Sequence, residues 1–142
     1  MKFLVVGFGG MGCRHTQSLV NSYNDCKVYV IEPSDEVFKK NYDLIKGYNY
    51  NLVRIENIHN LDDKIDFCVI ATSAEPRYNL LDNLLNHDIK NYLIEKVVFQ
   101  SDSQFNSIIN KTKDREVSIY VNFVNRYFEN YIKIKNDIKK SY

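Results

Sequence analysis

Three glycines near the amino terminus have the spacing of a phosphate-binding turn. Gly7, Gly9 and Gly12 directly follow an apolar segment of strand length and open a segment of helical character. At these positions glycine permits a tight turn, close approach of a pyrophosphate to the backbone, and close packing of helix on strand. The free N–H groups of the helix would then face the phosphates. We expect cofactor contacts from the whole turn: Gly7, Phe8, Gly9, Gly10, Met11 and Gly12.

An acidic residue stands where a dinucleotide-binding domain places its ribose ligand. Glu32 ends the second apolar segment, about 20 residues after Gly12. Its carboxylate can accept hydrogen bonds from both ribose hydroxyls, and its charge would repel a 2′-phosphate. Neither Pro33 nor Ser34 offers a cation for such a phosphate. A solvated strand end is the alternative interpretation, but the strand, turn, helix and acid together predict a dinucleotide site that prefers NAD to NADP.

These residues need an α/β scaffold, and the rest of the chain predicts one. Several apolar segments are continuous and rich in valine and isoleucine, which is typical of parallel strands covered on both faces by helices. We predict a doubly wound parallel six-stranded sheet of the Rossmann type, order 3-2-1-4-5-6, with helices on both faces and an abbreviated third crossover. The strands are expected at residues 2–6, 27–31, 51–55, 66–71, 92–95 and 117–123, and the helices at 11–23, 34–46, 75–87, 101–111 and 127–140.

The composition limits the classes of function. The 142 residues are 44% hydrophobic and 26% charged, which predicts one globular core rather than a disordered chain. The net charge is +1, so there is no strong field to attract nucleic acid or an anionic membrane. The apolar runs are too short for a membrane span or a signal peptide. We expect a cytoplasmic protein that has neither nucleic acid nor a membrane as a partner.

The residues that most often bind metals are too scattered to form a site. The cysteines form no Cys-x-x-Cys pair and the histidines lie far apart in the chain: Cys13, Cys26, Cys68, His15, His59 and His87. We expect three buried, reduced thiols and no metal site, and we interpret His15 as structural. The sequence has no nucleophile elbow and no P-loop lysine, so hydrolases and phosphotransferases have no support.

Four segments together resemble the glucose-fructose oxidoreductase, inositol dehydrogenase and rhizopine-catabolism (Gfo/Idh/MocA) family, whose N-terminal half is a Rossmann domain. Residues 7–15 are similar to its phosphate turn and the helix that follows. Residues 66–73 resemble its fourth strand and the loop under the cofactor, 93–97 its Glu-Lys-Pro signature, and 121–127 its sixth strand and the next turn. The resemblance covers nearly the whole chain and implies further cofactor-binding residues: Ala71, Thr72, Ser73, Glu95, Lys96 and Asn122.

The resemblance also implies a catalytic role for Lys96. In the family this lysine lies near the nicotinamide and the substrate, where it can hydrogen-bond a substrate hydroxyl and stabilise charge as hydride and proton leave. Two positions depart from the family pattern, since Val97 replaces the proline and Arg77 stands where many members have histidine. We expect a looser backbone after Lys96, and we expect cofactor binding to survive both departures.

The family's catalytic domain would follow the sixth strand, whereas this chain stops at Tyr142. We therefore predict a dinucleotide-binding Rossmann domain over residues 1–125 and, over residues 126–142, a helix that would lead into an absent C-terminal substrate domain. The chain would be truncated and inactive alone. The apolar side chains of the last helix would stay uncovered, which predicts a homo-oligomer formed through them: Tyr127, Phe128, Tyr131 and Ile134.

Three functions are compatible with these observations. The first is the NAD-binding domain of an NAD-dependent oxidoreductase of carbohydrate metabolism that acts on a sugar or related polyol. The second is a free-standing NAD-sensing regulatory module, which would need no second domain. The third is a domain that kept the fold and lost the ligand. Glu95, Lys96 and residues 122–127 favour the first, because a sensing domain has no use for them.

Overall fold

Parallel strands with their carboxyl ends at one edge form the sheet. The computed structural model describes residues 1–47, 51–61 and 63–140, and within these ranges six strands pair in the order β3-β2-β1-β4-β5-β6. The predicted doubly wound α/β topology is confirmed. The strands are β1 (Lys2–Val6), β2 (Lys27–Ile31), β3 (Asn51–Ile55), β4 (Phe67–Ile70), β5 (Asn91–Glu95) and β6 (Ser118–Asn122).

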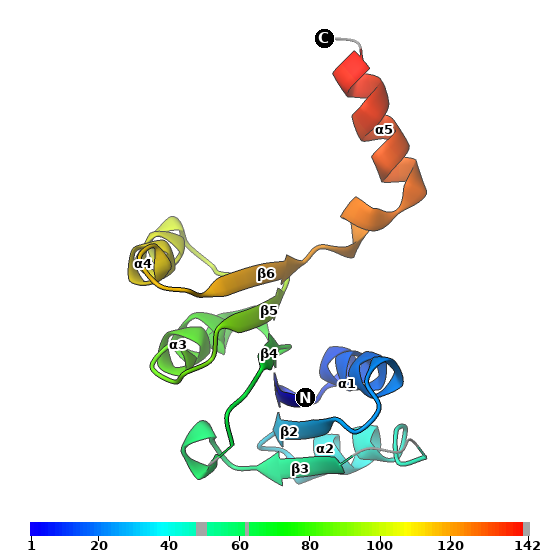
Figure 1. Ribbon diagram of the computed structural model, residues 1–142, viewed down its shortest axis with the longest axis vertical. Coiled ribbons are helices and arrows are strands. Elements are labelled where there is room, and N and C mark those ends of the chain that lie inside the picture. Colours follow the sequence, from blue (N-terminus) through cyan, green and yellow to red (C-terminus); the bar gives the residue numbers. More distant parts are fainter. Residues whose placement is uncertain (48–50, 62, 141–142) are drawn as a thin grey trace.

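Helices cover both faces of the sheet, with α1 and α2 on one face and α3 and α4 on the other (Figure 1). Two helices begin at serine caps, because the Ser34 hydroxyl accepts a hydrogen bond from the Val37 amide at 3.2 Å and Ser101 caps α4 in the same way. The helices are α1 (Gly10–Ser22), α2 (Asp35–Tyr42), α3 (Ala74–Leu84), α4 (Asp102–Thr112) and α5 (Glu129–Lys140), with short 3-10 helices η1 (Ile58–Asn60) and η2 (Val124–Tyr127).

Helix α2 is shorter than the predicted span of residues 34–46. It ends at Tyr42, and the amides of Leu44 and Ile45 bond to carbonyls three residues earlier, at 3.2 and 3.0 Å. These tighter turns bring the Ile45 side chain, which is fully buried, into the core. Burial of one large apolar side chain thus overrides helical continuation. The predicted short third crossover is observed as η1.

In strands β1 to β5, side chains that point to opposite faces of the sheet pack into two separate cores. On β1, Phe3 and Val5 belong to the core under α1 and α2, whereas Leu4 and Val6 belong to the core under α3 and α4. This two-sided burial explains why the central strands carry apolar residues at consecutive positions, such as 3–6 and 67–70, rather than only at every second one. The three cysteines are free and buried, as expected from the sequence.

The amino edge of the sheet is held by a cluster of charges around Asp63. The carboxylate accepts hydrogen bonds from Lys2 Nζ at 2.7 Å and Lys27 Nζ at 3.0 Å, and it also contacts the Tyr29 hydroxyl. The two ammonium groups and the hydroxyl hold the pKa of Asp63 well below its ordinary value. The cluster ties β1 and β2 to the segment that precedes β4.

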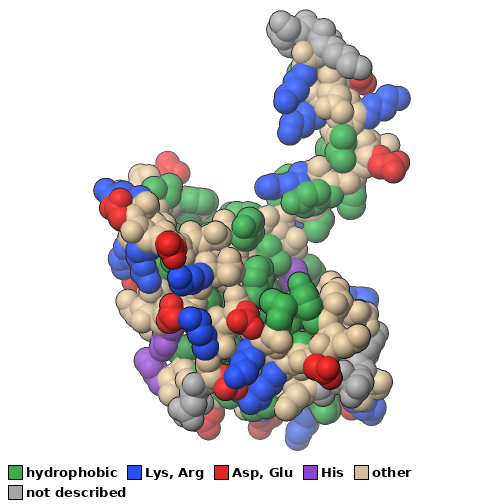
Figure 2. Space-filling view, in the orientation of Figure 1, with side chains coloured by type: hydrophobic (Ala, Val, Ile, Leu, Met, Phe, Trp, Pro, Cys, Tyr) green, Lys and Arg blue, Asp and Glu red, His purple; other side chains and the backbone are tan. Residues whose placement is uncertain are grey.

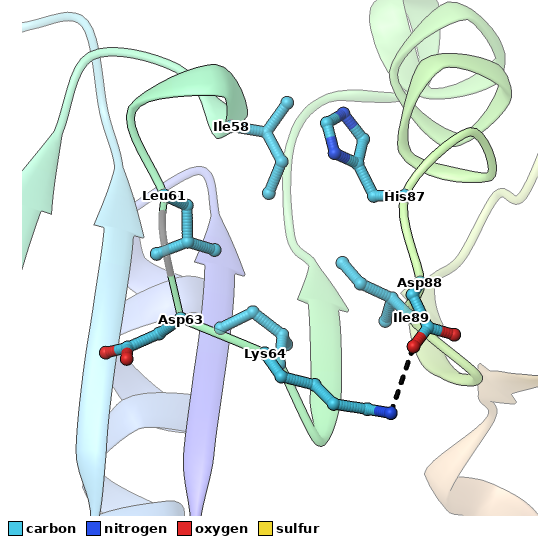
Figure 3. A pocket seen from close by; sticks show the side chains of 8 residues that line it. Ile58, Leu61, Asp63, Lys64, His87, Asp88 and Ile89 are labelled. Carbon is cyan, nitrogen blue, oxygen red and sulfur yellow. Dashed lines mark ion pairs between the residues drawn. The ribbon is translucent and has the colours of Figure 1, made fainter.

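A small cavity of about 260 Å³ lies beside this edge (Figure 3). The Lys64 ammonium and the Asp88 carboxylate form an ion pair of 2.9 Å at its mouth. Ligands of open α/β sheets bind at the carboxyl ends of the strands, so this cavity lies at the wrong edge for a dinucleotide. Its lining residues are Ile58, Leu61, Asp63, Lys64, Ile65, His87, Asp88 and Ile89.

Helix α5 stands away from the sheet (Figure 1), and several of its apolar side chains are exposed. Hydrophobic side chains gather where the chain leaves β6 and continue along α5 (Figure 2). Tyr127 is 75% exposed, and Phe128, Tyr131, Ile134 and Ile138 are also exposed. In the part of the chain that the structure describes, no helix is both long and apolar enough to cross a bilayer.

Candidate dinucleotide-binding site

The glycine turn connects the end of β1 to α1, and two of its glycines are required by close backbone packing. Gly7 has a φ of +86°, and a Cβ on it would lie 2.9 Å from Thr72 Cγ2. A Cβ on Gly12 would lie 1.9 Å from the Gly7 carbonyl oxygen. By contrast, Cβ atoms on Gly9 and Gly10 would meet no described atom within 4 Å, which leaves room for a ligand against the backbone.

The two larger residues of the turn face opposite ways. Phe8 is fully buried and packs against Phe38, with ring centroids 5.4 Å apart. Its side chain therefore belongs to the core, and only its backbone is available to a cofactor. Met11, on the first turn of α1, is about half exposed.

Glu32, directly after β2, is fixed by two backbone amides. One carboxylate oxygen accepts a hydrogen bond from the Phe8 amide at 2.9 Å, and the other accepts one from the Ser34 amide at 3.0 Å. Each oxygen keeps a further lone pair for a ligand hydroxyl. The carboxylate is thus oriented before any ligand arrives, at the carboxyl edge of the sheet and next to the glycine turn.

Glu32 borders a cavity of about 510 Å³, called here the Glu32 cavity, whose lining residues are Glu32, Pro33, Asp35, Arg54, Ile55 and Glu56. Arg54, on β3, donates hydrogen bonds to the Glu32 carbonyl and forms an ion pair with Asp35. The prediction that no cation lies near Glu32 was based only on its neighbours in the chain, Pro33 and Ser34. The parallel register places Arg54 beside Val30 on β2, two residues before Glu32, and so brings a cation to this cavity.

The loop after β4 lies against the glycine turn. Ala71 donates its amide hydrogen to the Val6 carbonyl at 2.8 Å, which extends the β1 pairing by one residue. Thr72 then packs on Gly7, and Ser73 is the exposed residue that precedes α3. The three residues implied by the family resemblance therefore border the same edge as the turn.

A second polar group joins three elements at the ends of β5 and β6. Glu95 and Asn122 are register partners, and Asn122 Nδ2 donates to Glu95 Oε1 at 2.5 Å. His15 Nε2, from α1, lies 2.7 Å from the same oxygen. His15 and Glu95 are 80 residues apart in the chain, and the spacing of the sequence gave no signal of this contact.

Glu95 is ionised at neutral pH in spite of its burial. Burial alone would raise the pKa of this carboxyl, but the hydrogen bonds from Asn122 and His15 outweigh it, and the pKa lies below its ordinary value of 4.5. Because the carboxylate can only accept, the His15 Nε2 atom carries the hydrogen that it shares with Glu95. The result is a fixed negative charge on the residue that directly precedes Lys96.

Lys96 is exposed, and the peptide bond between Lys96 and Val97 is cis. The structure gives its ammonium no hydrogen bond or ion pair with the described residues. Its side chain is therefore available to a ligand at this edge. Lys96 directly follows Glu95, so an exposed ammonium and a buried carboxylate are carried by adjacent residues.

Arg77, on α3, holds the backbone around Lys96. It is 2% exposed, and its guanidinium donates to the Glu95 carbonyl at 2.6 Å and to the carbonyls of Val97 and Thr72. Burial lowers the pKa of Arg77, an effect that the nearby Glu95 charge opposes. We predicted a looser backbone after Lys96, but Arg77 holds the carbonyls on both sides of Lys96, those of Glu95 and Val97. Arg77 could be recognised from the sequence as a departure from the family pattern, but its contacts with these carbonyls could not be predicted.

Among residues 1–47, 51–61 and 63–140, no group of three or more His, Cys, Asp or Glu side chains is arranged to hold a metal ion.

A further cavity of about 420 Å³ borders Asn122 on β6, with Tyr120 and Phe123 exposed at its surface. The carboxyl edge thus presents open backbone, two oriented carboxylates, an exposed amine and apolar surface. That combination suits a ligand with phosphates, ribose hydroxyls and a flat ring.

Comparison with known proteins agrees with this geometry. Residues 1–123 match the family model described as oxidoreductase family, NAD-binding Rossmann fold (GFO_IDH_MocA). No curated protein matches the chain.

Several solved dehydrogenases are similar in fold. The myo-inositol dehydrogenase of Lactobacillus casei, in complex with NAD(H) and myo-inositol, superimposes with a TM-score of 0.81 at 19% identity, over 99% of this chain and 41% of that protein. The WlbA dehydrogenase of Bordetella pertussis, in complex with NADH and UDP-GlcNAcA, has a TM-score of 0.82 at 12% identity, over 99% of this chain and 41% of that protein. The UDP-N-acetylglucosamine 3-dehydrogenase GnnA of Acidithiobacillus ferrooxidans has a TM-score of 0.75 at 14% identity, over 96% of this chain and 43% of that protein. The chain spans about two-fifths of the length of these proteins.

Proposed function

The chain belongs to the GFO_IDH_MocA oxidoreductase family with an NAD-binding Rossmann fold, and from this premise we propose that it binds NAD for a dehydrogenase that acts on a sugar or a related polyol. The observation that carries the proposal is the pair of features at the carboxyl edge, namely the glycine turn and the Glu32 carboxylate fixed by the amides of Phe8 and Ser34. The fixed carboxylate suits the ribose hydroxyls, and the open backbone at Gly9 and Gly10 suits the pyrophosphate.

Lys96 is the residue that we assign to the chemistry. When bound, NAD⁺ supplies the acceptor for a hydride, with its two electrons, from the carbon of a substrate alcohol. The exposed ammonium of Lys96 would hydrogen-bond the substrate hydroxyl and stabilise the negative charge on that oxygen as its proton passes to a base of the proposed substrate domain. The Glu95 carboxylate, held by His15 and Asn122, fixes the end of β5 from which Lys96 projects.

The proposed activity requires substrate contacts from outside the described domain. We assign residues 1–125 to cofactor binding, and residues 126–142 to a helix that would connect to a substrate domain. The solved dehydrogenases are more than twice as long as this chain, which supports a second domain as the source of those contacts. Two of them act on or bind sugar nucleotides and one a cyclic polyol, which supports a sugar or polyol substrate.

Titration calorimetry of the chain with NAD⁺, NADH and NADPH tests the cofactor. We expect both NAD forms to bind and NADPH to bind more weakly. The variant Glu32→Gln removes the charge and keeps one side-chain oxygen, which can accept from only one of the Phe8 and Ser34 amides. It should weaken the binding of NADH by about tenfold, the loss of one charge-assisted hydrogen bond.

Glu36→Gln is the matched control, because Glu36 is exposed on α2 and the same charge is removed. It should leave binding unchanged. Absence of heat with all three nucleotides would contradict the proposal and favour a domain that lost its ligand. Binding of NAD by the chain, with no dehydrogenase activity in any longer form that contains it, would favour a regulatory sensor.

The exposed apolar side chains at the end of η2, at Phe128 and along α5 support self-association of the chain on its own. Removing Tyr127, Phe128 and Tyr131 from water would be favourable at about 25 cal/mol per Å² of apolar surface. We expect sedimentation equilibrium to show a concentration-dependent dimer. A double change of Phe128 and Tyr131 to serine should shift it to monomer, whereas a purely monomeric unchanged chain at high concentration would refute the dimer.

A further inference from the structure

Arg54 is the cation of the Glu32 cavity, and two backbone carbonyls fix it there. Its Nε and Nη2 atoms donate to the Glu32 carbonyl at 2.9 and 2.7 Å, and Nη2 also reaches the Pro33 carbonyl at 3.2 Å. The guanidinium lies over the Phe38 ring, 4.9 Å from its centroid. These contacts use one side of the guanidinium and leave Nη1 directed elsewhere.

Asp35 occupies the remaining side. Its carboxylate contacts Nη1, and the hydrogen bond and the charge of Arg54 hold the pKa of Asp35 below its ordinary value. The Asp35 side chain is 77% exposed and that of Arg54 is 30% exposed, so the pair lies at the mouth of the cavity rather than in the core. Asp35 is also the first residue of α2, where the helix dipole favours its charge.

The charges of the cavity oppose a phosphate. Glu32, Asp35 and Glu56 line it together with Arg54, which gives three carboxylates against one guanidinium. A free guanidinium binds phosphate well, because its planar donors match two phosphate oxygens at once. In this cavity Nη1, the Arg54 nitrogen that does not bond the Glu32 and Pro33 carbonyls, is the one that contacts Asp35.

We propose that Asp35 blocks Arg54 from binding a 2′-phosphate, and that Asp35 together with Glu32 sets the preference for a dinucleotide with a free ribose 2′-hydroxyl. The inference rests on the proposed NAD-binding function and adds a second residue to its specificity. Without Asp35, the Glu32 and Pro33 carbonyls would still hold Arg54 in the wall of the cavity. Its Nη1 donors would then face the position of the phosphate.

Calorimetric titration of NADH and NADPH into four forms of the chain tests this. They are the unchanged chain, Asp35→Asn, Arg54→Met, and the double variant. Asp35→Asn should tighten the binding of NADPH relative to that of NADH by about tenfold, the gain of one charge-assisted hydrogen bond. The double variant should lose this gain, because the cation that receives the phosphate is gone. Arg54→Met alone should bind NADPH no better than the unchanged chain.

The control is Glu36→Gln, which removes a neighbouring exposed carboxylate that has no contact with Arg54 in the described structure. An equal gain in NADPH affinity from Glu36→Gln would overturn the proposal, because the removal of any nearby negative charge would then explain the gain. Unchanged NADPH affinity in Asp35→Asn, or a gain that persists in the double variant, would also overturn it. Failure of the unchanged chain to bind NADH would instead overturn the proposed function, and the inference with it. Thermal unfolding of each form shows whether the fold is kept.

Discussion

Replacing Gly12 with alanine is expected to weaken NAD binding by at least about 100-fold and to destabilise the fold by about 3 kcal/mol. The added Cβ would lie 1.9 Å from the Gly7 carbonyl oxygen, a backbone atom that cannot turn aside as a side chain can. Helix α1 would have to move away from β1, and the turn between them would change shape. The amides that we propose to face the pyrophosphate would move with it.

The measurements are calorimetric titration with NADH and urea unfolding. Gly47→Ala is the matched control, because a Cβ there meets no described atom within 4 Å and the φ angle is not in the left-handed region. That control should keep full affinity and equal or slightly higher stability. If Gly12→Ala binds NADH as tightly as the control, then close packing at Gly12 does not form the site.

Replacing Arg77 with leucine should lower the free energy of unfolding by about 3–5 kcal/mol, the range for removing one member of a buried polar network. The guanidinium serves the carbonyls of Thr72, Glu95 and Val97, and leucine would leave all three without that donor. These carbonyls flank the loop that touches Gly7 and the turn that carries Lys96. NAD affinity should therefore fall together with stability, even where the variant is still folded.

Arg115→Leu is the matched control for Arg77→Leu, since Arg115 donates to a single carbonyl, that of Leu85, before β6. It should cost about 1 kcal/mol in urea unfolding and leave NADH affinity unchanged. Arg77→Lys, which keeps the charge but not the planar donors, should give an intermediate result. Equal stability of Arg77→Leu and Arg115→Leu would show that the Arg77 contacts contribute little.

The sheet could be predicted because its signal is local and repeated. Each strand is a short run of valine, isoleucine and other apolar residues, and the predicted strand limits differ from the observed ones by at most one residue. Helix limits were less accurate, because the end of α2 depends on Ile45 reaching the core, which no local pattern specifies. The glycine turn and Glu32 were predictable for the same reason as the strands, since both follow from spacing along the chain.

The contacts that complete the site were not predictable in this way. Asn122 meets Glu95 through strand register, and His15 meets it through the packing of α1, so both depend on the assembled sheet. Arg54 reaches the Glu32 cavity from β3, a strand whose own sequence carries no sign of a ligand. Arg77 could be recognised as unusual, but its three carbonyl partners follow from the positions of α3 and the end of β5.

The long separation between His15 and Glu95 has a consequence for when the site exists. The two residues are 80 positions apart, and Asn122 lies beyond both, so their meeting requires nearly every strand to be in place. Non-local contacts of this kind form late, after much of the chain entropy has been lost. The proposed ligand-binding edge is therefore a product of complete folding, and a nucleotide that contacts it would stabilise the native state over every partly folded one.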